Sequence, residues 1–505
     1  MEGVQILLLL AGSLAVTAVA RRLDWPAPLL LVAVGLAVSF APGVPDFRLE
    51  PELVLVIVLP PLLYSSALDS SYVNIRRNIR PIALLAVGLV LATTLGVGLV
   101  AHLVIPALPL PAALVLGALV APPDAVAAVA IGRKLGLPRR IMTLLTGESL
   151  VNDATALTAY KVAVAAATGE AMSWGTGIVT FLAASVGGTL IGYLIGVVVH
   201  WIRLRLRDSL LESGLGMLVP FGAYLIGEAA QTSGVLAVVA AGLYLGHNAP
   251  RAGYATRLQE TAVWRAVDLL LESWVFGLIG LQLRFVLADS GATWPLFGAA
   301  LVVLLAAMVI RILWMYPGTY VPRLLSAKIR AREDAPAPRA VFIVAWTGMR
   351  GVVSLAAASA LPLTMPGRDV IVLCTFVVTV GTLMVQGLSL PGLIRLLGVR
   401  NDDERVDTAA EAQVKATAAE AAVARLAEAA DGQAPEPVVA RLKALAEHRA
   451  KGETTAARWK QLRLTMLVAE REVFLAARDA HEIDDEVFRR VQRELDLEEA
   501  ALTRE

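Results

Sequence analysis

Long apolar stretches alternate with short polar loops along residues 1–395. A helix needs about 20 apolar residues to cross the hydrocarbon core of a bilayer. Thirteen stretches fit this description, at residues 4–20, 27–41, 51–67, 81–105, 110–132, 141–167, 175–201, 211–230, 232–247, 262–287, 293–317, 339–362 and 368–392. The pattern therefore predicts an all-α membrane protein of about thirteen transmembrane helices, although the loop between the eighth and ninth spans is very short.

Lysine and arginine gather in alternate loops. The basic loops hold Arg21 and Arg22; Arg76, Arg77 and Arg80; Arg133, Lys134, Arg139 and Arg140; Arg203, Arg205 and Arg207; Arg251 and Arg257; and Arg323 to Arg332. The loops between them contain almost none, with Arg48 and Arg368 as exceptions. Because cytoplasmic loops carry the basic excess, an odd number of spans places the N-terminus outside. We expect a multi-pass protein of the plasma (inner) membrane.

The composition changes near residue 400. Residues 401–505 are rich in Ala, Glu, Arg and Asp, and they show helical periodicity over 408–430, 437–450 and 454–480. A turn-forming stretch from Gly432 to Pro437 separates the first two of these segments. We expect a transmembrane domain at 1–395 and a cytoplasmic helical region at 401–505, for which the sequence assigns no role.

The overall composition excludes several classes of protein. With 57% hydrophobic and 17% charged residues and a mean hydropathy of +0.68, the chain is too apolar for a soluble domain. A net charge of +1 gives no reason to expect nucleic acid as a partner. The single cysteine, Cys374, can form neither a disulfide framework nor a zinc site. We expect no cofactor, and we interpret the apolar N-terminal stretch as a first span.

Several ionisable residues fall within the predicted spans. Each costs about 2.5–3.5 kcal/mol at the centre of a membrane helix, so each indicates either function or a buried partner. These residues are Asp124, Glu148, Asp153, Glu228, Glu272, Arg311 and Arg350. Acid–arginine pairing that only holds helices together suits Glu148, Glu272 and Arg311 better than it suits the two aspartates, whose surroundings differ.

Two spans carry helix-breaking residues beside a charge. Pro122 and Pro123 precede Asp124 in the middle of the fifth span, and two glycines flank Arg350 in the twelfth. Proline removes a backbone donor and clashes with the preceding turn, and irregular backbone at membrane depth is tolerated only where it is buried or lines a cavity. If spans 1–6 and 8–13 are inverted repeats, the two breaks correspond and cross near the midplane.

The sixth span contains a second polar segment, from Gly147 to Thr155. Ser149 and Asp153 are four residues apart and share one helix face. Their hydroxyl and carboxylate are hard oxygen ligands suited to sodium. Asn152 adds an uncharged hydrogen-bonding group, whereas Glu148 points elsewhere.

These motifs resemble those of a known family. Pro123-Asp124, the run Gly-Glu-Ser-Leu-Val-Asn-Asp at 147–153 and Gly-Met-Arg-Gly at 348–351 are similar to the monovalent cation/proton antiporter family, which includes NhaP-type bacterial and animal sodium/proton exchangers. The similarity covers roughly residues 5–395. It implies a thirteen-span fold of inverted repeats, a homodimer, and alternating access by an elevator-like movement of the core.

The resemblance also implies roles for the ion-site residues. Asp153 would be the carboxylate that binds the ion and the proton, and Asn152 its partner in the pair that marks the electroneutral branch. Ser149 and the backbone near Pro123 and Asp124 would complete the sodium site.

The same resemblance assigns the other buried charges. Arg311 would be held by Glu148, Arg350 would offset half-helix charges at the crossing, and Glu272 would correspond to an acid of the tenth span. Many relatives have Thr-Asp-Pro at the fifth-span break, and some have an acid where this chain has Ser65. The choice among sodium, potassium and lithium therefore stays open.

The expected activity is secondary active antiport rather than enzyme chemistry. A buried carboxylate without a counter-charge accepts either a cation or a proton, so sodium (or lithium) and H⁺ would compete for Asp153. Potassium/proton exchange is the alternative within this class, and a cation channel is the alternative outside it. A channel usually shows a re-entrant filter loop and an ATP-driven pump a phosphate-binding loop, and the sequence shows neither. The partners are Na⁺, H⁺ and the lipid bilayer.

Overall fold

The computed structural model forms two compact units, Met1–Asn401 and Asp402–Glu505. It describes residues 3–42, 47, 51–169, 174–206, 208–251, 253–290, 293–332, 335–399, 417–418, 420–428, 436–450, 460–461, 463–470, 472–474, 491, 494–499 and 502. Every regular element among these residues is helical. The predicted all-α class is confirmed.

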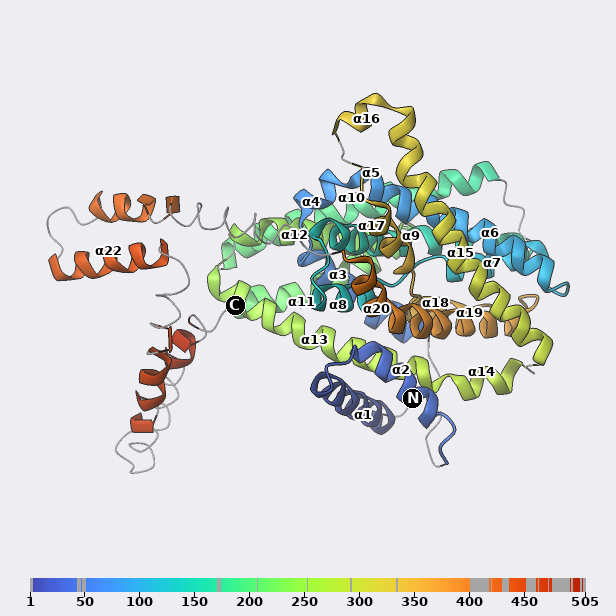
Figure 1. The fold of residues 1–505 in the computed structure, drawn as a ribbon, viewed down its shortest axis with the longest axis horizontal. Coiled ribbons are helices and arrows are strands. Elements are labelled where there is room, and N and C mark those ends of the chain that lie inside the picture. Colours follow the sequence, from blue (N-terminus) through green and yellow to red (C-terminus); the bar gives the residue numbers. More distant parts are fainter. Residues whose placement is uncertain are drawn as a thin grey trace. The chain divides into compact units, whose positions relative to one another are not determined.

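The helices of the first unit follow one another through short connections (Figure 1). They are α1 (Gly3–Arg22), α2 (Ala27–Val38), α3 (Leu59–Leu68), α4 (Tyr72–Arg77), α5 (Ile79–Ala83), α6 (Val90–Val104), α7 (Leu110–Val120), α8 (Ala125–Lys134), α9 (Arg139–Ala167), α10 (Trp174–Leu206), α11 (Ser209–Ala229), α12 (Gly234–Asn248), α13 (Tyr254–Leu281), α14 (Leu283–Ser290), α15 (Trp294–Leu325), α16 (Ala327–Arg332), α17 (Pro338–Trp346), α18 (Val352–Ser359), α19 (Arg368–Thr382) and α20 (Leu388–Leu397). Wider π-helical turns at Leu53–Val58, Leu84–Leu89 and Leu383–Gly387 lead directly into α3, α6 and α20.

Membrane-spanning helices account for most of this unit. Among the described residues, eight segments are long and apolar enough to cross a bilayer: Val4–Arg22, Ile79–Val104, Leu110–Lys134, Gly177–Leu206, Ser209–Ala229, Ala255–Ala288, Trp294–Leu325 and Arg368–Leu397. Two shorter apolar helices, Ala27–Val38 and Leu53–Leu68, fall on the second and third predicted spans. The remaining three predicted spans, at 141–167, 232–247 and 339–362, coincide with α9, α12 and the α17–α18 pair. The count of thirteen spans stays a prediction.

The short connection between α11 and α12 has a specific backbone geometry. Gln231 adopts a left-handed conformation with φ of 54°. The backbone N–H of Thr232 donates to the carbonyl of Gly227 at 2.9 Å, and that of Gln231 donates to Glu228 at 3.0 Å. Hydrogen bonds of this kind, from residues just past a helix back to its last turn, satisfy the final carbonyls of the helix and reverse the chain direction. A loop of a few residues therefore suffices to reverse the chain here.

The two breaks predicted in the fifth and twelfth spans are present. The first interruption separates α7, which ends at Val120, from α8, which begins at Ala125; the second separates α17 from α18 between Trp346 and Val352. In the first break, two consecutive prolines leave neighbouring carbonyls without helical donors. Both interruptions lie within long apolar segments, where they position unpaired backbone groups for the site described below.

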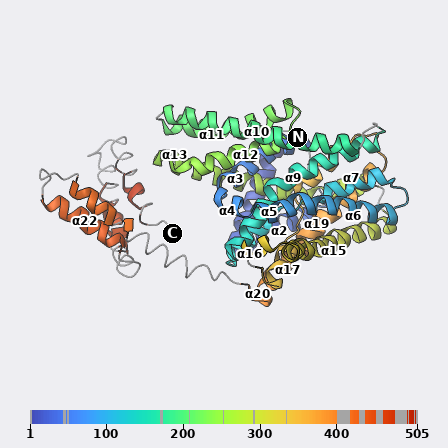
Figure 2. The same ribbon diagram turned by 90° about the horizontal axis from the view of Figure 1, so that it is seen from above.

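The helix α9 lies between two groups of helices. On one side α10 packs against α12, α12 against α3, and α13 against α1 and α2. On the other side α6 packs against α7 and α15, and α15 packs against α19. Figure 2 shows α10, α11 and α13 on one side of this unit and α15, α17 and α19 on the other. Because α9 contacts α7, α8 and α12, its side chains can meet both groups.

The second unit contains the helix α22 (Glu436–Ala450), which matches the predicted segment 437–450 closely. Much of the predicted segments 408–430 and 454–480 lies outside the described residues. Arg463 donates to Glu470 and to Glu498, each at 2.7 Å. The hydrogen bond from Arg463 lowers the pKa of Glu498. This contact therefore stabilises the unit at neutral pH and weakens as the carboxylate is protonated in acid.

Candidate functional site

The two helix breaks meet each other. The backbone N–H of Asp124 donates to the carbonyl of Met349 at 2.7 Å. The Cβ of Asp124 lies so close to Gly351 that a Cβ built on that glycine would be 2.7 Å from it. The interrupted helices α7–α8 and α17–α18 therefore cross at these residues, as their spacing predicts.

Replacement of Gly351 by alanine should disrupt this crossing. The added methyl group would overlap both the Cβ and the carboxylate of Asp124, and overpacking of this kind costs about 1–3 kcal/mol or more. We expect a lower thermal midpoint of the purified protein and strongly reduced transport. Gly222→Ala in α11 is a matched control, because nothing lies within 4 Å of the added methyl group. Equal stability of the two variants would contradict the proposed crossing geometry.

Asp124 caps the helix that follows the first break. Its Oδ1 accepts from the backbone N–H of Val126 at 2.8 Å, so it satisfies an orphan donor at the N-terminus of α8. Its negative charge also faces the positive end of that helix dipole. The sequence predicts Asp124 as an ion ligand, and the structure shows that part of its hydrogen-bonding capacity is used in this cap.

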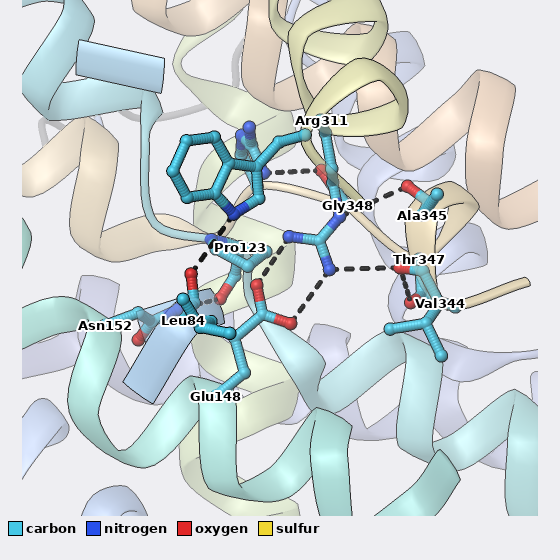
Figure 3. A network of polar contacts seen from close by, with 11 residues as sticks. Leu84, Pro123, Glu148, Asn152, Arg311, Val344, Ala345, Thr347 and Gly348 are labelled. Atoms are coloured by element: carbon cyan, nitrogen blue, oxygen red, sulfur yellow. Dashed lines mark hydrogen bonds and ion pairs between the residues drawn. The ribbon is translucent and has the colours of Figure 1, made fainter. Parts of the chain in front are cut away.

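Asn152 joins α9 to the same break. Its side chain is fully buried, and its Nδ2 donates to the carbonyl of Pro123 at 2.7 Å (Figure 3). This carbonyl is one of the acceptors that the broken helix leaves free. The Oδ1 of Asn152 is buried and has no hydrogen-bond partner in the described part of the chain. The amide therefore fixes the break to α9 and keeps an unused oxygen at the crossing.

Asp153 lies beside a very small cavity. Its side chain is buried, and the cavity of about 10 Å³ is also lined by Pro122, Tyr160 and Ser354. That volume is enough for about one water molecule. The hydroxyl of Ser354 is buried without a hydrogen-bond partner among the residues that can be described. Asp153 itself has no ion-pair partner there, so the carboxylate has space for one small ligand and no counter-charge.

A much wider cavity, of about 440 Å³, approaches from the side where α3 and α8 end and α9 begins. Its wall is rich in hydroxyl groups and acids, from Ser65, Ser66, Ser70, Ser71, Thr143, Thr146, Ser149, Asp69, Asp268 and Glu272, with Arg133 also present. Ser149 lies four residues before Asp153, a rise of about 6 Å along the helix. The predicted sodium ligands Asp153 and Ser149 therefore line different cavities, and the wide cavity ends one helical turn short of Asp153.

Glu148 and Arg311 form a buried, bidentate ion pair. The two nitrogen–oxygen distances are 2.5 and 2.9 Å, and each residue is 1% exposed. Arg311 also donates from Nε to the carbonyl of Ala345 at 3.2 Å and from Nη2 to that of Val344 at 3.1 Å (Figure 3). These contacts join α9, α15 and the end of α17, and so hold the helix that carries Asp153 against both neighbours.

The other two predicted charge-pair residues have different surroundings. Arg350 is buried, its Nη1 donates to the carbonyl of Gly348 at 2.9 Å, and its backbone N–H donates to Oγ1 of Thr382 at 3.0 Å. Neither Arg350 nor Glu272 has an ion-pair partner within the described residues. Glu272 instead lines the wide cavity, together with Arg133.

Glu228 falls within the span predicted at 211–230, but it lies at the end of that span rather than at membrane depth. It belongs to the last turn of α11, where its side chain is 39% exposed and lies 3.4 Å from Nζ of Lys161. Its Oε1 also accepts from the backbone N–H of Gly234 at 3.3 Å. Because the helix ends at Ala229, this acid is partly exposed and paired with Lys161.

Comparison with known proteins decides the family. The family described as "Sodium/hydrogen exchanger, transmembrane" matches residues 6–396. The chain belongs to this exchanger family. The resemblance to NhaP-type cation/proton antiporters is confirmed, and the exchanger is a member of a family of transporters rather than of enzymes.

Individual relatives of the exchanger agree with this assignment. It is 33% identical to the Na⁺/H⁺ antiporter ApNhaP of Aphanothece halophytica over 91% of this chain and 86% of the relative. It is 32% identical to a sodium, potassium, lithium and rubidium/H⁺ antiporter of Bacillus pumilus over 72% of this chain and 57% of the relative. The solved structure of the sodium proton antiporter MjNhaP1 of Methanocaldococcus jannaschii matches with a TM-score of 0.62 and 19% identity, over 78% of this chain and 98% of the other. This last match shows a shared fold.

Sequence reasoning missed two polar residues of the exchanger. Asp268 accepts a hydrogen bond from the hydroxyl of Ser65, and its other oxygen is buried without a partner in the described portion. Asp268 and Glu272 are four residues apart and therefore share one helix face. This pairing of acids is a sequence signal that could have identified Asp268 as a polar residue of the cavity. Ser354 follows the second break by three residues, but nothing in the sequence distinguishes it from a serine that only packs.

Proposed function

We propose that this exchanger moves Na⁺, and with it Li⁺, in exchange for H⁺ at Asp153. The observation that carries the proposal is the environment of that carboxylate: it is buried beside a cavity of about 10 Å³, next to two crossing helix breaks, with no described counter-charge. Ser354, Asp124 and the carbonyls of the break supply the other oxygen ligands, whereas Ser149 lines the wide cavity one helical turn away.

Competition at one carboxylate produces exchange. A bare carboxylate is costly away from water, so it is neutralised by a proton or by a cation. One cation entering from one side displaces one proton, and the reverse occurs on the other side. Asn152 adds no second titrating charge, which supports one-for-one, electroneutral exchange.

The wide acidic cavity is the proposed route from the cytoplasm. It opens beside the exposed Asp69 and Arg133, near the loops with the basic excess, which the positive-inside rule assigns to the cytoplasm. The N-terminus would then lie outside and residues 401–505 in the cytoplasm, beside a transmembrane domain at 1–395 in the plasma membrane. We propose alternating access by movement of the helices around α9, in a homodimer.

Potassium is the second candidate cation. The relative from Bacillus pumilus is named for sodium, potassium, lithium and rubidium, and the wide cavity of this exchanger is large enough for hydrated ions of any of these. Selection would then depend on the small cavity at Asp153, whose size favours the smaller, dehydrated Na⁺ or Li⁺.

Proteoliposomes containing the full chain and a pH-sensitive dye test the proposal. Addition of Na⁺ or Li⁺ should release protons from the opposite compartment, and K⁺ should do so less at equal concentration. An imposed membrane potential should leave the rate unchanged. Current without counter-transport would establish a channel and sink the proposal, and a response to K⁺ alone would replace Na⁺ with K⁺.

Asp268→Asn should weaken the capture of cations without abolishing exchange. An acid in a cavity wall raises the local cation concentration, so its removal should raise the apparent KM for Na⁺ about three- to tenfold and change the maximal rate little. The measurement is the sodium dependence of proton release at low ionic strength. Glu228→Gln is the control, since that acid lies at the end of α11 and does not line the cavity. An unchanged KM in Asp268→Asn would exclude this access route.

A further inference from the structure

A second cavity on the first unit has the opposite electrostatic character. It measures about 230 Å³ and lies between α5, the start of α9, the second half of α15 and the start of α17. Three arginines line it, Arg80, Arg140 and Arg323, and no acidic residue from the described part of the chain does. The remaining wall is mostly apolar, from Pro81, Leu84, Leu85, Pro138, Ile141, Leu144, Trp314, Met315, Gly318, Pro336, Ala337, Ala340, Val341 and Val344, with Thr319 as its one uncharged polar residue in the described part of the chain.

The two cavities lie on different faces of the same helical turns. Thr143 and Thr146 of α9 line the acidic cavity, whereas Arg140, Ile141 and Leu144 line the basic one. A transported cation is attracted by the acids and repelled by the arginines. The basic cavity is therefore unsuited to the transported ions and suited to an anion.

The combination of arginines and apolar wall identifies the class of anion. A free phosphate needs only the charges, whereas a phospholipid also needs an apolar surface for its acyl chains. The hydroxyl of Tyr320 in α15 donates to the carbonyl of Pro336 at 2.9 Å, and the ring of Tyr316 stacks on the ring of Tyr320. Tyrosines of this kind are typical of a membrane–water interface. We propose that an anionic phospholipid binds here, with its phosphate at the arginines and an acyl chain along the apolar wall.

Two residues that line this cavity, Leu84 and Val344, also accept hydrogen bonds from side chains of α15, including Arg311 of the Glu148–Arg311 pair. The carbonyl of Val344 accepts from Arg311 at 3.1 Å, and the carbonyl of Leu84 accepts from Nε1 of Trp314 at 3.2 Å (Figure 3). A lipid in the cavity contacts α5, α9, α15 and α17 together, so it stabilises the arrangement that the Glu148–Arg311 pair holds. This inference depends on membrane embedding of the first unit and is independent of which cation is exchanged.

Lipid binding to the purified full chain tests the charged part of the site. In a neutral detergent, phosphatidylglycerol should raise the thermal midpoint and remain bound in native mass spectra, and phosphatidylcholine should do so much less. Arg80→Gln and Arg140→Gln should each lower phosphatidylglycerol affinity about fivefold, the change that corresponds to about 1 kcal/mol per basic residue. Arg77→Gln should have no such effect, because this exposed arginine of α4 does not line the cavity.

A second variant tests the apolar part. Ala340→Phe places a large side chain in the apolar part of the cavity and leaves all three arginines, so it should also lower phosphatidylglycerol affinity. Gly318→Leu, in the same cavity, serves the same purpose if the first variant does not fold. Equal binding of the two lipids, an equal effect of Arg77→Gln, or full binding to both filled variants would overturn the proposal. So would glycerol phosphate reproducing the thermal shift, because that result would establish a site for soluble anions. Each of these outcomes leaves proton exchange at Asp153 untouched.

Discussion

Asp153→Asn should abolish sodium-dependent proton movement in everted vesicles. Asparagine is nearly isosteric with aspartate, but it can neither release a proton nor neutralise a cation. The native carboxylate lies beside a cavity of about one water's volume with no described counter-charge, and the nearby Asp124 is already used in the cap of α8. We expect a loss of at least about 100-fold in rate, the range over which removal of an essential proton-transfer group acts.

The same variant should remain folded. Removal of a buried carboxylate without a partner relieves a desolvation cost, so the thermal midpoint of Asp153→Asn should equal or exceed that of the native protein. Asp24→Asn is a matched control, since Asp24 is an exposed acid with φ of 58° and asparagine tolerates that conformation. Retained exchange in Asp153→Asn at normal protein levels would show that another group binds the ions.

The sequence predicts the helix breaks well because their cause is local. Two prolines before Asp124 remove donors whatever surrounds them, and glycines on both sides of Arg350 weaken the second helix. Their crossing follows from the spacing of the two breaks in the chain. The spacing does not predict how closely the two breaks approach each other. That distance depends on the absence of a side chain at Gly351, which lies next to Asp124.

The division of the site into two cavities is not predictable from the sequence. Ser149 and Asp153 share a helix face, so the sequence predicts that they bind one ion. In the structure the backbone of the first break lies beside that face through the contact of Asn152 with Pro123, and a different cavity reaches each side chain. The position of that break relative to α9 depends on a contact between residues 29 positions apart in the chain, which local sequence patterns do not predict.

The buried charges show the same limit. Glu148 could meet Arg311 or Arg350 on sequence grounds alone, and only the family resemblance favours the former. The structure places the carboxylate against Arg311, 163 positions away. Arg350 is used differently, because it donates to a carbonyl within its own break. The expectation of a charge pair for Glu272 is not met among the described residues, since helix α13 turns this acid toward a cavity.

Removal of one member of the Glu148–Arg311 pair should have the largest effect on stability. Glu148→Gln or Arg311→Met leaves a charge buried at 1% exposure without its partner, which costs about 3–5 kcal/mol. We expect low protein levels and a strongly lowered thermal midpoint for each single variant. Lys161→Gln is the control, because its pair with Glu228 is 66% and 39% exposed, and exposed pairs contribute about 1 kcal/mol or less.

The double variant Glu148→Gln with Arg311→Met should recover much of this loss, because no uncompensated charge remains. An exchange of the two charged residues should recover less, since a glutamate at position 311 would face the carbonyls of Val344 and Ala345, which Arg311 satisfies as a donor. Thermal midpoints of the four variants distinguish these cases. If neither double variant exceeds the single variants, the pair does not act as a unit, and the stability of the core derives from the carbonyl contacts of Arg311 instead.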